Sequence, residues 1–317
     1  MKRFAVALAT LIFVGVAGAQ DFPSREIHLV LGVPPGSAAD IIARAFTPVM
    51  AEKLKQPVII ESRPGADTAI ATNLVRGAKA DGYTLLLAQP AHAINPTLYP
   101  DRPYDPVKDF TPIALVATSS NTIVVSADSP IRDLPGLIAA AKAKPGELNY
   151  GDAGGSPYLA IEMLNAMAGI RTTHVMYKGA AEAFTDVLGG RLDYAPGSVS
   201  SASTLVRSGK LRALAVTSAN RNPDWPDVPA IGELMPGYVA IAWWGVVGPA
   251  DMPAPVVAKL NAAIAAAIRD PAVKARLAAM QIDAVTGTAD EFSAFIVSEA
   301  QKWAPIVKAT SAARRGN

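Results

Sequence analysis

The sequence predicts an α/β protein of two domains, in which mostly parallel sheets are flanked by helices. Strand-like and helix-like segments alternate in the first half of the chain, and the same alternation returns in its middle. Further β-like stretches lie where the chain would leave the first domain, at residues 111–116 and 122–126, and where it would return, at residues 238–247. The 317 residues, half of them hydrophobic and 18% charged, suffice for large buried cores and exclude a disordered protein.

In the first half, short apolar runs bounded by turn residues predict strands, and segments with helical periodicity lie between them. The expected strands are residues 27–33, 57–61 and 84–88, and the expected helices are residues 38–55 and 69–78. Pro48 lies inside the first helix and is expected to kink it or to end an initial turn. Residues 99–112 are rich in proline and have little periodicity, which predicts a surface loop.

In the second half, the same signals predict helices over residues 133–143, 156–168 and 180–188, and strands over residues 173–177, 192–195 and 212–217. The first crossing between the domains is expected near residues 117–121, and the return crossing over residues 238–247. Trp243 and Trp244 lie on the return strand, and adjacent strand residues face opposite ways, so at most one of them can cover a cleft. The remainder is expected to be helical, over residues 254–268, 271–279 and 289–310.

The N-terminus has the pattern of a secretory signal peptide. Lys2 and Arg3 form a short basic region, residues 4–16 are an apolar core, and Ala17-Gly18-Ala19 fits small-residue cleavage. We therefore expect cleavage after Ala19 and a periplasmic location. An uncleaved membrane anchor is the alternative, and the apolar run is shorter than a bilayer span needs.

Charge and cysteine content exclude several classes of function. Of the 29 basic residues, Lys2 and Arg3 precede the predicted cleavage, so 27 remain against 27 acidic residues. A chain with no net charge is a poor candidate for binding nucleic acid or an anionic membrane. The absence of cysteine excludes thiol catalysis and cysteine–metal sites.

The loop over residues 33–40, between the first predicted strand and helix, has the features of an anion site. Gly36 lets the backbone approach a ligand closely, and Ser37 is placed to cap the helix. The unpaired N–H groups of a helix start and the positive end of its dipole attract anions. The alternative is a capped turn with nothing bound, because the loop matches no phosphate-loop signature.

Two side chains near the predicted strand ends leave both functional and structural interpretations open. Asp40 is placed either to bind an amino or hydroxyl group of a ligand or to stabilise the helix dipole. His92 follows a predicted strand and is placed either to approach a cleft or to make a structural hydrogen bond. The three histidines have no metal-ligand spacing, and no catalytic motif occurs, so neither a metal site nor an enzyme is predicted.

Several segments, in order and at characteristic spacing, resemble one known family. They include residues 22–27, 33–40, 61–66, 81–86, 92–96, 104–110, 177–179 and 209–217. Each segment is weak alone, and their order and spacing make the match specific. On these segments, and over about residues 22–307, the chain resembles the periplasmic solute receptors of tripartite tricarboxylate transport, also called the Bordetella uptake gene family.

The resemblance implies a type II periplasmic binding protein, whose two lobes are joined by two crossing strands and close on a small organic acid. The implied lobes are residues 20–120 with 241–317, and residues 121–240. Family members hold a carboxylate with main-chain N–H groups and hydroxyls from one loop of each lobe. The implied ligand-binding residues are Pro35, Gly36, Ser37, Ala38, Asp40, Ala91 and His92 in lobe 1, and Asp152, Ala153, Gly154, Gly155, Ser156, Tyr177 and Ser198 in lobe 2.

The resemblance further implies a membrane permease as partner, no cofactor, no nucleic acid and a monomeric receptor. Two departures from the family pattern bear on the ligand. Asp152 would repel a second carboxylate if it pointed inward, and residues 195–201 replace a stretch that often holds Phe-Asp. We therefore expect an aromatic acid or a mono- or dicarboxylate rather than a tri-acid. A sensory receptor, and an exported enzyme acting on a small acid or ester, remain the alternative functions.

Overall fold

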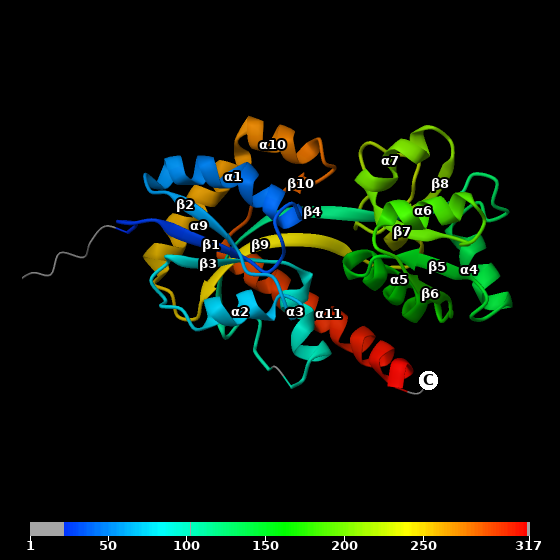
Figure 1. The fold of residues 1–317 in the computed structure, drawn as a ribbon, viewed down its shortest axis with the longest axis horizontal. Helices are drawn as coiled ribbons and strands as arrows, with labels where there is room; N and C mark the ends of the chain where they lie inside the picture. Colours follow the sequence, from blue (N-terminus) through cyan, green and yellow to red (C-terminus); the bar gives the residue numbers. More distant parts are fainter. Residues whose placement is uncertain (1–21, 102, 316–317) are drawn as a thin grey trace, which may run out of the picture.

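One strand of 17 residues, β4 (Phe110–Ser126), runs through both lobes of the molecule (Figure 1). The computed structural model describes residues 22–101 and 103–315, with side chains up to residue 309. The predicted signal peptide, residues 1–19, lies outside the described residues. β9 (Ile241–Pro249) runs antiparallel to β4 and returns the chain to the first lobe. The chain therefore has the two lobes and two crossing strands that the sequence predicts.

Lobe 1 is built on a sheet in the order β10-β4-β9-β3-β1-β2. β1 (Ile27–Leu31) pairs in parallel with both β2 (Val58–Ser62) and β3 (Thr84–Ala88). β9 is antiparallel to β3 and β4, and the short β10 (Asp283–Ala284) pairs with β4 at the edge. The pairings among β1, β2 and β3 are therefore parallel, whereas those of β9 with β3 and β4 and of β10 with β4 are antiparallel.

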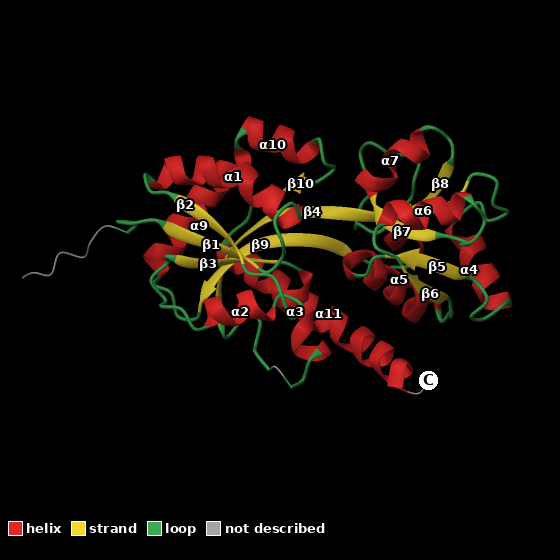
Figure 2. Ribbon diagram, viewed as in Figure 1, coloured by secondary structure: helices red, strands yellow, loops and turns green. Residues whose placement is uncertain are grey.

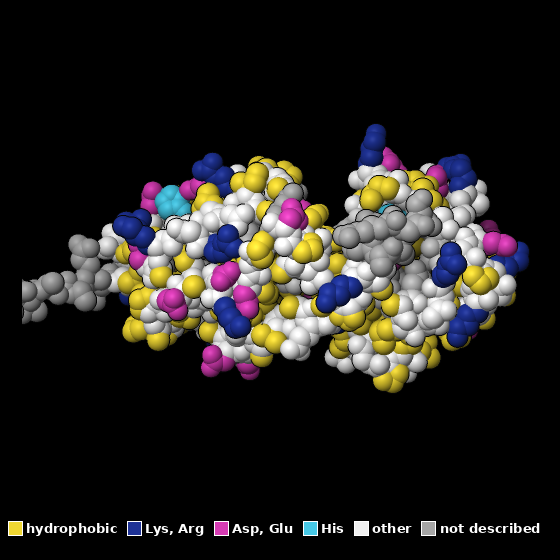
Figure 3. Space-filling model, turned by 90° about the horizontal axis from the view of Figure 1, so that it is seen from below, with side chains coloured by type: hydrophobic (Ala, Val, Ile, Leu, Met, Phe, Trp, Pro, Cys, Tyr) yellow, Lys and Arg dark blue, Asp and Glu magenta, His cyan; other side chains and the backbone are white. Residues whose placement is uncertain are grey.

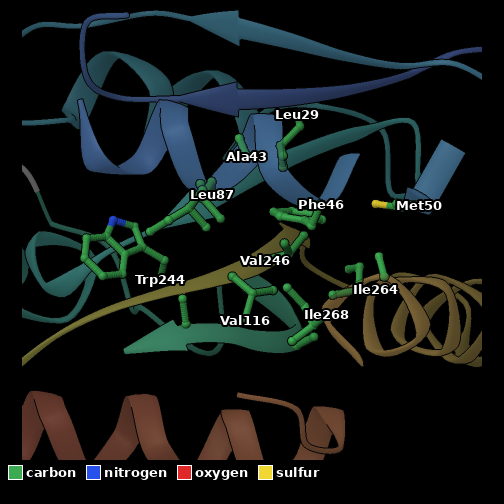
Figure 4. Packing of buried hydrophobic residues seen from close by; sticks show 14 of the residues in the cluster. Leu29, Ala43, Phe46, Met50, Leu87, Val116, Trp244, Val246, Ile264 and Ile268 are labelled. Atoms are coloured by element: carbon green, nitrogen blue, oxygen red, sulfur yellow. The ribbon is translucent and has the colours of Figure 1, made fainter. Parts of the chain in front are cut away.

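Helices cover both faces of this sheet (Figure 2). α1 (Ala38–Leu54), α9 (Ala254–Arg269) and α10 (Pro271–Ala278) pack on one face, where Phe46, Leu87 and Ile264 belong to a single buried cluster (Figure 4). α2 (Ala69–Arg76), α3 (Pro90–Leu98) and the first part of α11 (Ala289–Arg315) cover the other face. Burial on both faces explains the nearly continuous apolar sequence of β1 and β3.

Lobe 2 is also built of strands surrounded by helices, on a smaller scale. β7 (Ala195–Ser198) and β8 (Leu211–Val216) both pair antiparallel with the end of β4, and β5 (Asn149–Asp152) pairs in parallel with β6 (Thr173–Met176). A parallel bridge between Tyr150 and Tyr194 links the two groups of strands. The surrounding helices are α4 (Leu134–Ala143), α5 (Gly155–Ala168), α6 (Ala180–Leu188), α7 (Val199–Arg207) and α8 (Ile231–Leu234).

The last helix contacts both lobes. Its first half packs beneath the lobe 1 sheet, and its later residues Trp303, Ile306 and Val307 join the buried cluster that contains Tyr150 and Leu164 of lobe 2. In Figure 1 this helix runs from lobe 1 along the side of lobe 2. The buried carboxylate of Glu299 accepts hydrogen bonds from the indole nitrogens of Trp243 and Trp303, so β9 and α11 are tied together.

Several local predictions differ from the structure. α1 is continuous through Pro48, and β4 is a single strand rather than two. α3 and α7 were not predicted, and the strand expected at residues 192–195 forms at 195–198. α3 is short and contains Pro96, and α7 is rich in serine, so both segments have low intrinsic helix propensity. Long-range packing therefore determines that these two segments are helical.

The described residues form no large patch of one charge on the face shown in Figure 3. On the side shown in Figure 3, basic and acidic side chains are interspersed over both lobes. None of the described helices combines the length and hydropathy that crossing a bilayer requires.

Candidate functional site

Two cavities lie between the lobes and meet at Ser156, Ala242 and Trp244, which line both. One, which we name the helix-end cavity, has a volume of about 460 Å³. The other, the α3 cavity, has a volume of about 440 Å³. The helix-end cavity is lined by Ala38, Ser119, Asn121, Asp152, Ala153, Gly154, Ser156, Pro157, Ala180, Pro196, Gly197, Ser198, Ser200, Ser201, Ala242, Trp244, Met280 and Ile282. The α3 cavity is lined by Asp67, Gln89, Pro90, Ala91, Ile94, Asn95, Leu98, Gly155, Ser156, Tyr158, Leu159, Ala242, Trp244 and Val307.

Four helices begin at the helix-end cavity. Ala38 is the first residue of α1, Ala180 the first of α6, Gly154 caps α5, and Ser198 caps α7. The first N–H groups of a helix have no partner within it, and the helix dipole places partial positive charge there. The cavity can therefore hold an anion with backbone N–H groups alone.

The charged residues of the cleft also favour recognition of an anion by backbone N–H groups. Among the described residues that line the two cavities, none is lysine or arginine, and the charged ones are Asp67 and Asp152. Because no cation is present on the walls, an anion bound there depends on helix ends and on hydroxyls such as those of Ser156, Ser198 and Ser201.

The α1 loop uses much of its hydrogen-bonding capacity internally. The Asp40 carboxylate accepts from the Gly36 N–H at 3.0 Å and from Arg44 Nε at 3.0 Å, and the Asp40 N–H donates to the Ser37 hydroxyl. The hydrogen bond from Arg44, aided by that from Gly36, holds the pKa of Asp40 below its usual value. Ala38 lines the helix-end cavity, whereas Pro35, Gly36, Ser37 and Asp40 line neither cavity.

The α5 loop, in contrast, faces the cleft. Asp152 is buried, and its Oδ1 accepts from the Gly154 N–H at 2.6 Å and lies 3.3 Å from His174 Nε2. Gly154 has φ 82° and ψ −164°, a conformation that essentially only glycine adopts. The Ser156 hydroxyl accepts from Asn121 Nδ2 at 2.6 Å, so a crossing-strand residue fixes its orientation. Asp152, Ala153, Gly154, Gly155 and Ser156 all line the cleft.

Of the remaining candidates, some line a cavity and others make hydrogen bonds away from both cavities. Ala91 lines the α3 cavity, and Ser198 lines the helix-end cavity, where its hydroxyl accepts from the Ser201 N–H and caps α7. His92 is buried against Tyr104 and Phe110, with Nε2 2.9 Å from the Pro106 carbonyl, and burial lowers its pKa to about 4. The Tyr177 hydroxyl donates to Asp186 at 2.6 Å. Neither His92 nor Tyr177 lines a cavity.

The tryptophan pair follows the predicted alternation. Trp244 lines both cavities, whereas Trp243 is buried on the opposite side of β9 against Phe292 and Phe295. The structure also adds lining residues that were not singled out from the sequence, among them Gln89, Asn95, Asn121, Ser200 and Ser201. The proline at position 90, which starts α3, was the signal for a further helix end at the cleft.

No described group of three or more His, Cys, Asp or Glu side chains is arranged to hold a metal ion. The two cavities are lined by helix ends, hydroxyls, amides, two aspartates, apolar side chains and one tryptophan. This set can bind and orient a small anion.

Comparisons with known proteins agree with this arrangement. Residues 42–312 match the tripartite tricarboxylate transporter family receptor. The chain is 37% identical over 290 residues to a UPF0065 protein of Pseudomonas sp. strain P51, covering 90% of this chain and 86% of that protein. It is 33% identical over 312 residues to protein BugT of Bordetella pertussis, covering 95% and 96% of the two chains.

Solved structures of similar proteins have the same fold. The MatC protein of Rhodopseudomonas palustris with bound malate has a TM-score of 0.72 and 30% identity, covering 90% of this chain and 100% of that one. The R. palustris protein Rpa4515 with adipate has a TM-score of 0.74 and 31% identity, covering 91% and 98%. A solute-binding protein from Polaromonas has a TM-score of 0.82 and 26% identity, covering 90% and 99%. This chain belongs to the tripartite tricarboxylate transporter receptor family, whose members are substrate-binding proteins with the periplasmic binding protein fold.

Proposed function

We propose that this protein is a periplasmic receptor that captures a small organic acid between its lobes and delivers it to a membrane permease of the tripartite tricarboxylate type. The observation that carries the proposal is the convergence of four helix starts on one cavity whose described walls contain no cation. A carboxylate is the anion that this geometry suits, and malate and adipate are bound in the structures of two similar proteins.

In this proposal, the two lobes close on the ligand by bending the crossing strands β4 and β9. The lobe 1 part comprises residues 20–120 with 241–317, and the lobe 2 part comprises residues 121–240. A ligand that contacts α1 from one lobe and α5 and α7 from the other binds the closed state better than the open one, and so shifts the population toward closure. The permease then distinguishes the closed form. Cleavage after Ala19 releases the receptor into the periplasm.

The first test is a thermal-shift screen against small carboxylates, followed by calorimetry on each hit, with the chain purified after export into a bacterial periplasm. A ligand at one hundred times its Kd stabilises the folded state by about 2.7 kcal/mol. We expect at least one acid to bind and to be recovered unchanged after incubation. Conversion of a bound acid would establish an enzyme instead, and failure of every acid to bind would contradict the carboxylate site.

A pair of charge variants on α7 locates the anion. Ser200 lines the helix-end cavity and Thr204 lies on the same helix away from both cavities, and both residues are exposed. Ser200→Asp places a negative charge beside the bound carboxylate and should weaken its affinity by about tenfold, whereas Thr204→Asp should change it less than twofold. Equal losses in the two variants would place the anion outside this cavity.

A further inference from the structure

The α3 cavity differs in chemistry from the helix-end cavity, which it joins at Trp244. Its walls are largely apolar, formed by Ile94, Leu98, Leu159, Ala242, Trp244 and Val307. These residues come from α3, α5, β9 and α11, so both lobes and the last helix contribute. An apolar space beside a set of helix ends fits a ligand with an anionic head and an apolar body.

One polar side chain in this cavity has an unused acceptor. Asn95 is buried, and its Nδ2 donates to the Asp67 carbonyl at 2.6 Å, which fixes the orientation of the amide. Its Oδ1 is buried and has no hydrogen-bond partner. Leaving a buried acceptor unpaired is costly, so the site favours a ligand that donates a hydrogen bond to this atom.

The charges of the cleft disfavour a second carboxylate. Asp67 lines the α3 cavity at its exposed side, and Asp152 lines the helix-end cavity with its Oδ2 buried and unpaired. A ligand with a carboxylate at each end would bring its remote charge into the cavity that contains Asp67 and Asn95 Oδ1. Neither group donates a hydrogen bond, and one repels a negative charge.

Resting on the proposed function, we propose that the ligand is a monocarboxylic acid with an elongated apolar body and a hydrogen-bond donor at its remote end. The carboxylate binds the helix starts of the helix-end cavity. The body lies against Trp244 and Leu159 in the α3 cavity, and the remote hydroxyl or amine donates to Asn95 Oδ1. This class differs from the dicarboxylates, malate and adipate, bound by two similar proteins.

Three acids that share the rigid cinnamate frame and differ only at the para position test this inference on the unmodified protein. 4-Hydroxycinnamate carries the donor, cinnamate lacks it, and 4-carboxycinnamate replaces it with a second carboxylate. We expect calorimetry to give 4-hydroxycinnamate about tenfold higher affinity than cinnamate, with 4-carboxycinnamate weakest, because a neutral hydrogen bond in a buried site contributes up to about that factor. Tighter binding of 4-carboxycinnamate, malate, adipate or citrate would overturn the inference and leave the proposed receptor function standing. Failure of every acid to bind would contradict both.

Asn95→Leu isolates the remote hydrogen bond, because leucine has a similar volume and no acceptor. The advantage of 4-hydroxycinnamate over cinnamate should fall from about tenfold to less than twofold, while the affinity for cinnamate is retained. An unchanged ratio would overturn the role of Asn95. Leu98→Asp, at a more exposed position of the same cavity, provides a second variant. It should weaken both cinnamates by about tenfold, and unchanged affinity would show that the body does not lie there.

Discussion

The two lobes present their polar groups to the cleft in opposite ways. In lobe 1, Asp40 and His92 bond within their own lobe, to Arg44 and to the Pro106 carbonyl. In lobe 2, the Ser156 and Ser198 hydroxyls line the cleft itself. The comparison teaches that a polar residue beside a helix start can serve the ligand only if it lines the cleft. Ser156 and Ser198 do so although their hydroxyls also accept hydrogen bonds from Asn121 and the Ser201 N–H. Lobe 1 contributes the start of α1 and polar side chains such as Gln89 and Asn95, and lobe 2 contributes three helix starts and serine hydroxyls.

The largest expected effect concerns His92 and tests whether lobe 1 keeps it uncharged. Its pKa is about 4 in the folded protein and near 6.5 in the unfolded chain, so the unfolded chain binds the extra proton between these values. Stability should therefore fall by about 3 kcal/mol as the pH drops from 6.5 to 4. Urea denaturation at several pH values measures this loss, and in His92→Leu the loss over this window should be smaller by about 3 kcal/mol. An equally steep loss in the variant would assign it to other groups.

The next effect tests the α5 loop. Gly154→Ala forces an alanine into a conformation that only glycine tolerates and should cost about 2 kcal/mol of stability. Because the loop carries N–H groups at the cleft, the affinity for the acid should fall by about tenfold. Gly209→Ala is the matched control, since Gly209 also has a positive φ, of 69°, and lies outside both cavities. The control should lose about 1 kcal/mol of stability and keep its affinity.

Asp40→Ala tests the internal role assigned to the α1 loop. The variant loses the hydrogen bonds from Gly36 and Arg44, and denaturant unfolding should show a loss of about 1.5 kcal/mol. The affinity for the acid should change less than twofold, because Asp40 lines neither cavity. A tenfold loss of affinity in a folded variant would show that Asp40 contacts the ligand and would remove the contrast between the lobes.

The smallest effect on stability is expected from Ser156→Ala. The variant removes the acceptor of Asn121 Nδ2 and should lose about 1 kcal/mol of stability. Since the hydroxyl lines both cavities, calorimetry should also show an affinity several-fold lower. Ser208→Ala, at the far end of α7, is the control, and its affinity should be unchanged. Equal affinity in the two variants would mean that Ser156 only supports the loop.

Much of the architecture was predictable from local sequence. The strand at 84–88 and the helix at 180–188 form where their periodicity and flanking turn residues predicted them. Pro96, inside the helix, obscured α3, and its residues Asn95 and Leu98 were therefore missed as parts of the site. α5 begins at Gly155, one residue before the predicted start, and the Ser156 hydroxyl accepts a hydrogen bond from Asn121, 35 residues earlier in the chain.

The sequence by itself determined the α/β alternation, the two crossing strands, the glycine and serine loops at helix starts, and the family resemblance. These features depend on periodicity and on turn residues that act within a few positions of each other. Only the tertiary structure decided that Asp40 and His92 bond within lobe 1, that α11 contacts both lobes, and that Asn95 keeps a free acceptor in the cleft. Each of these depends on partners brought together by packing, and the direction of a side chain toward them is not encoded in its neighbours along the chain.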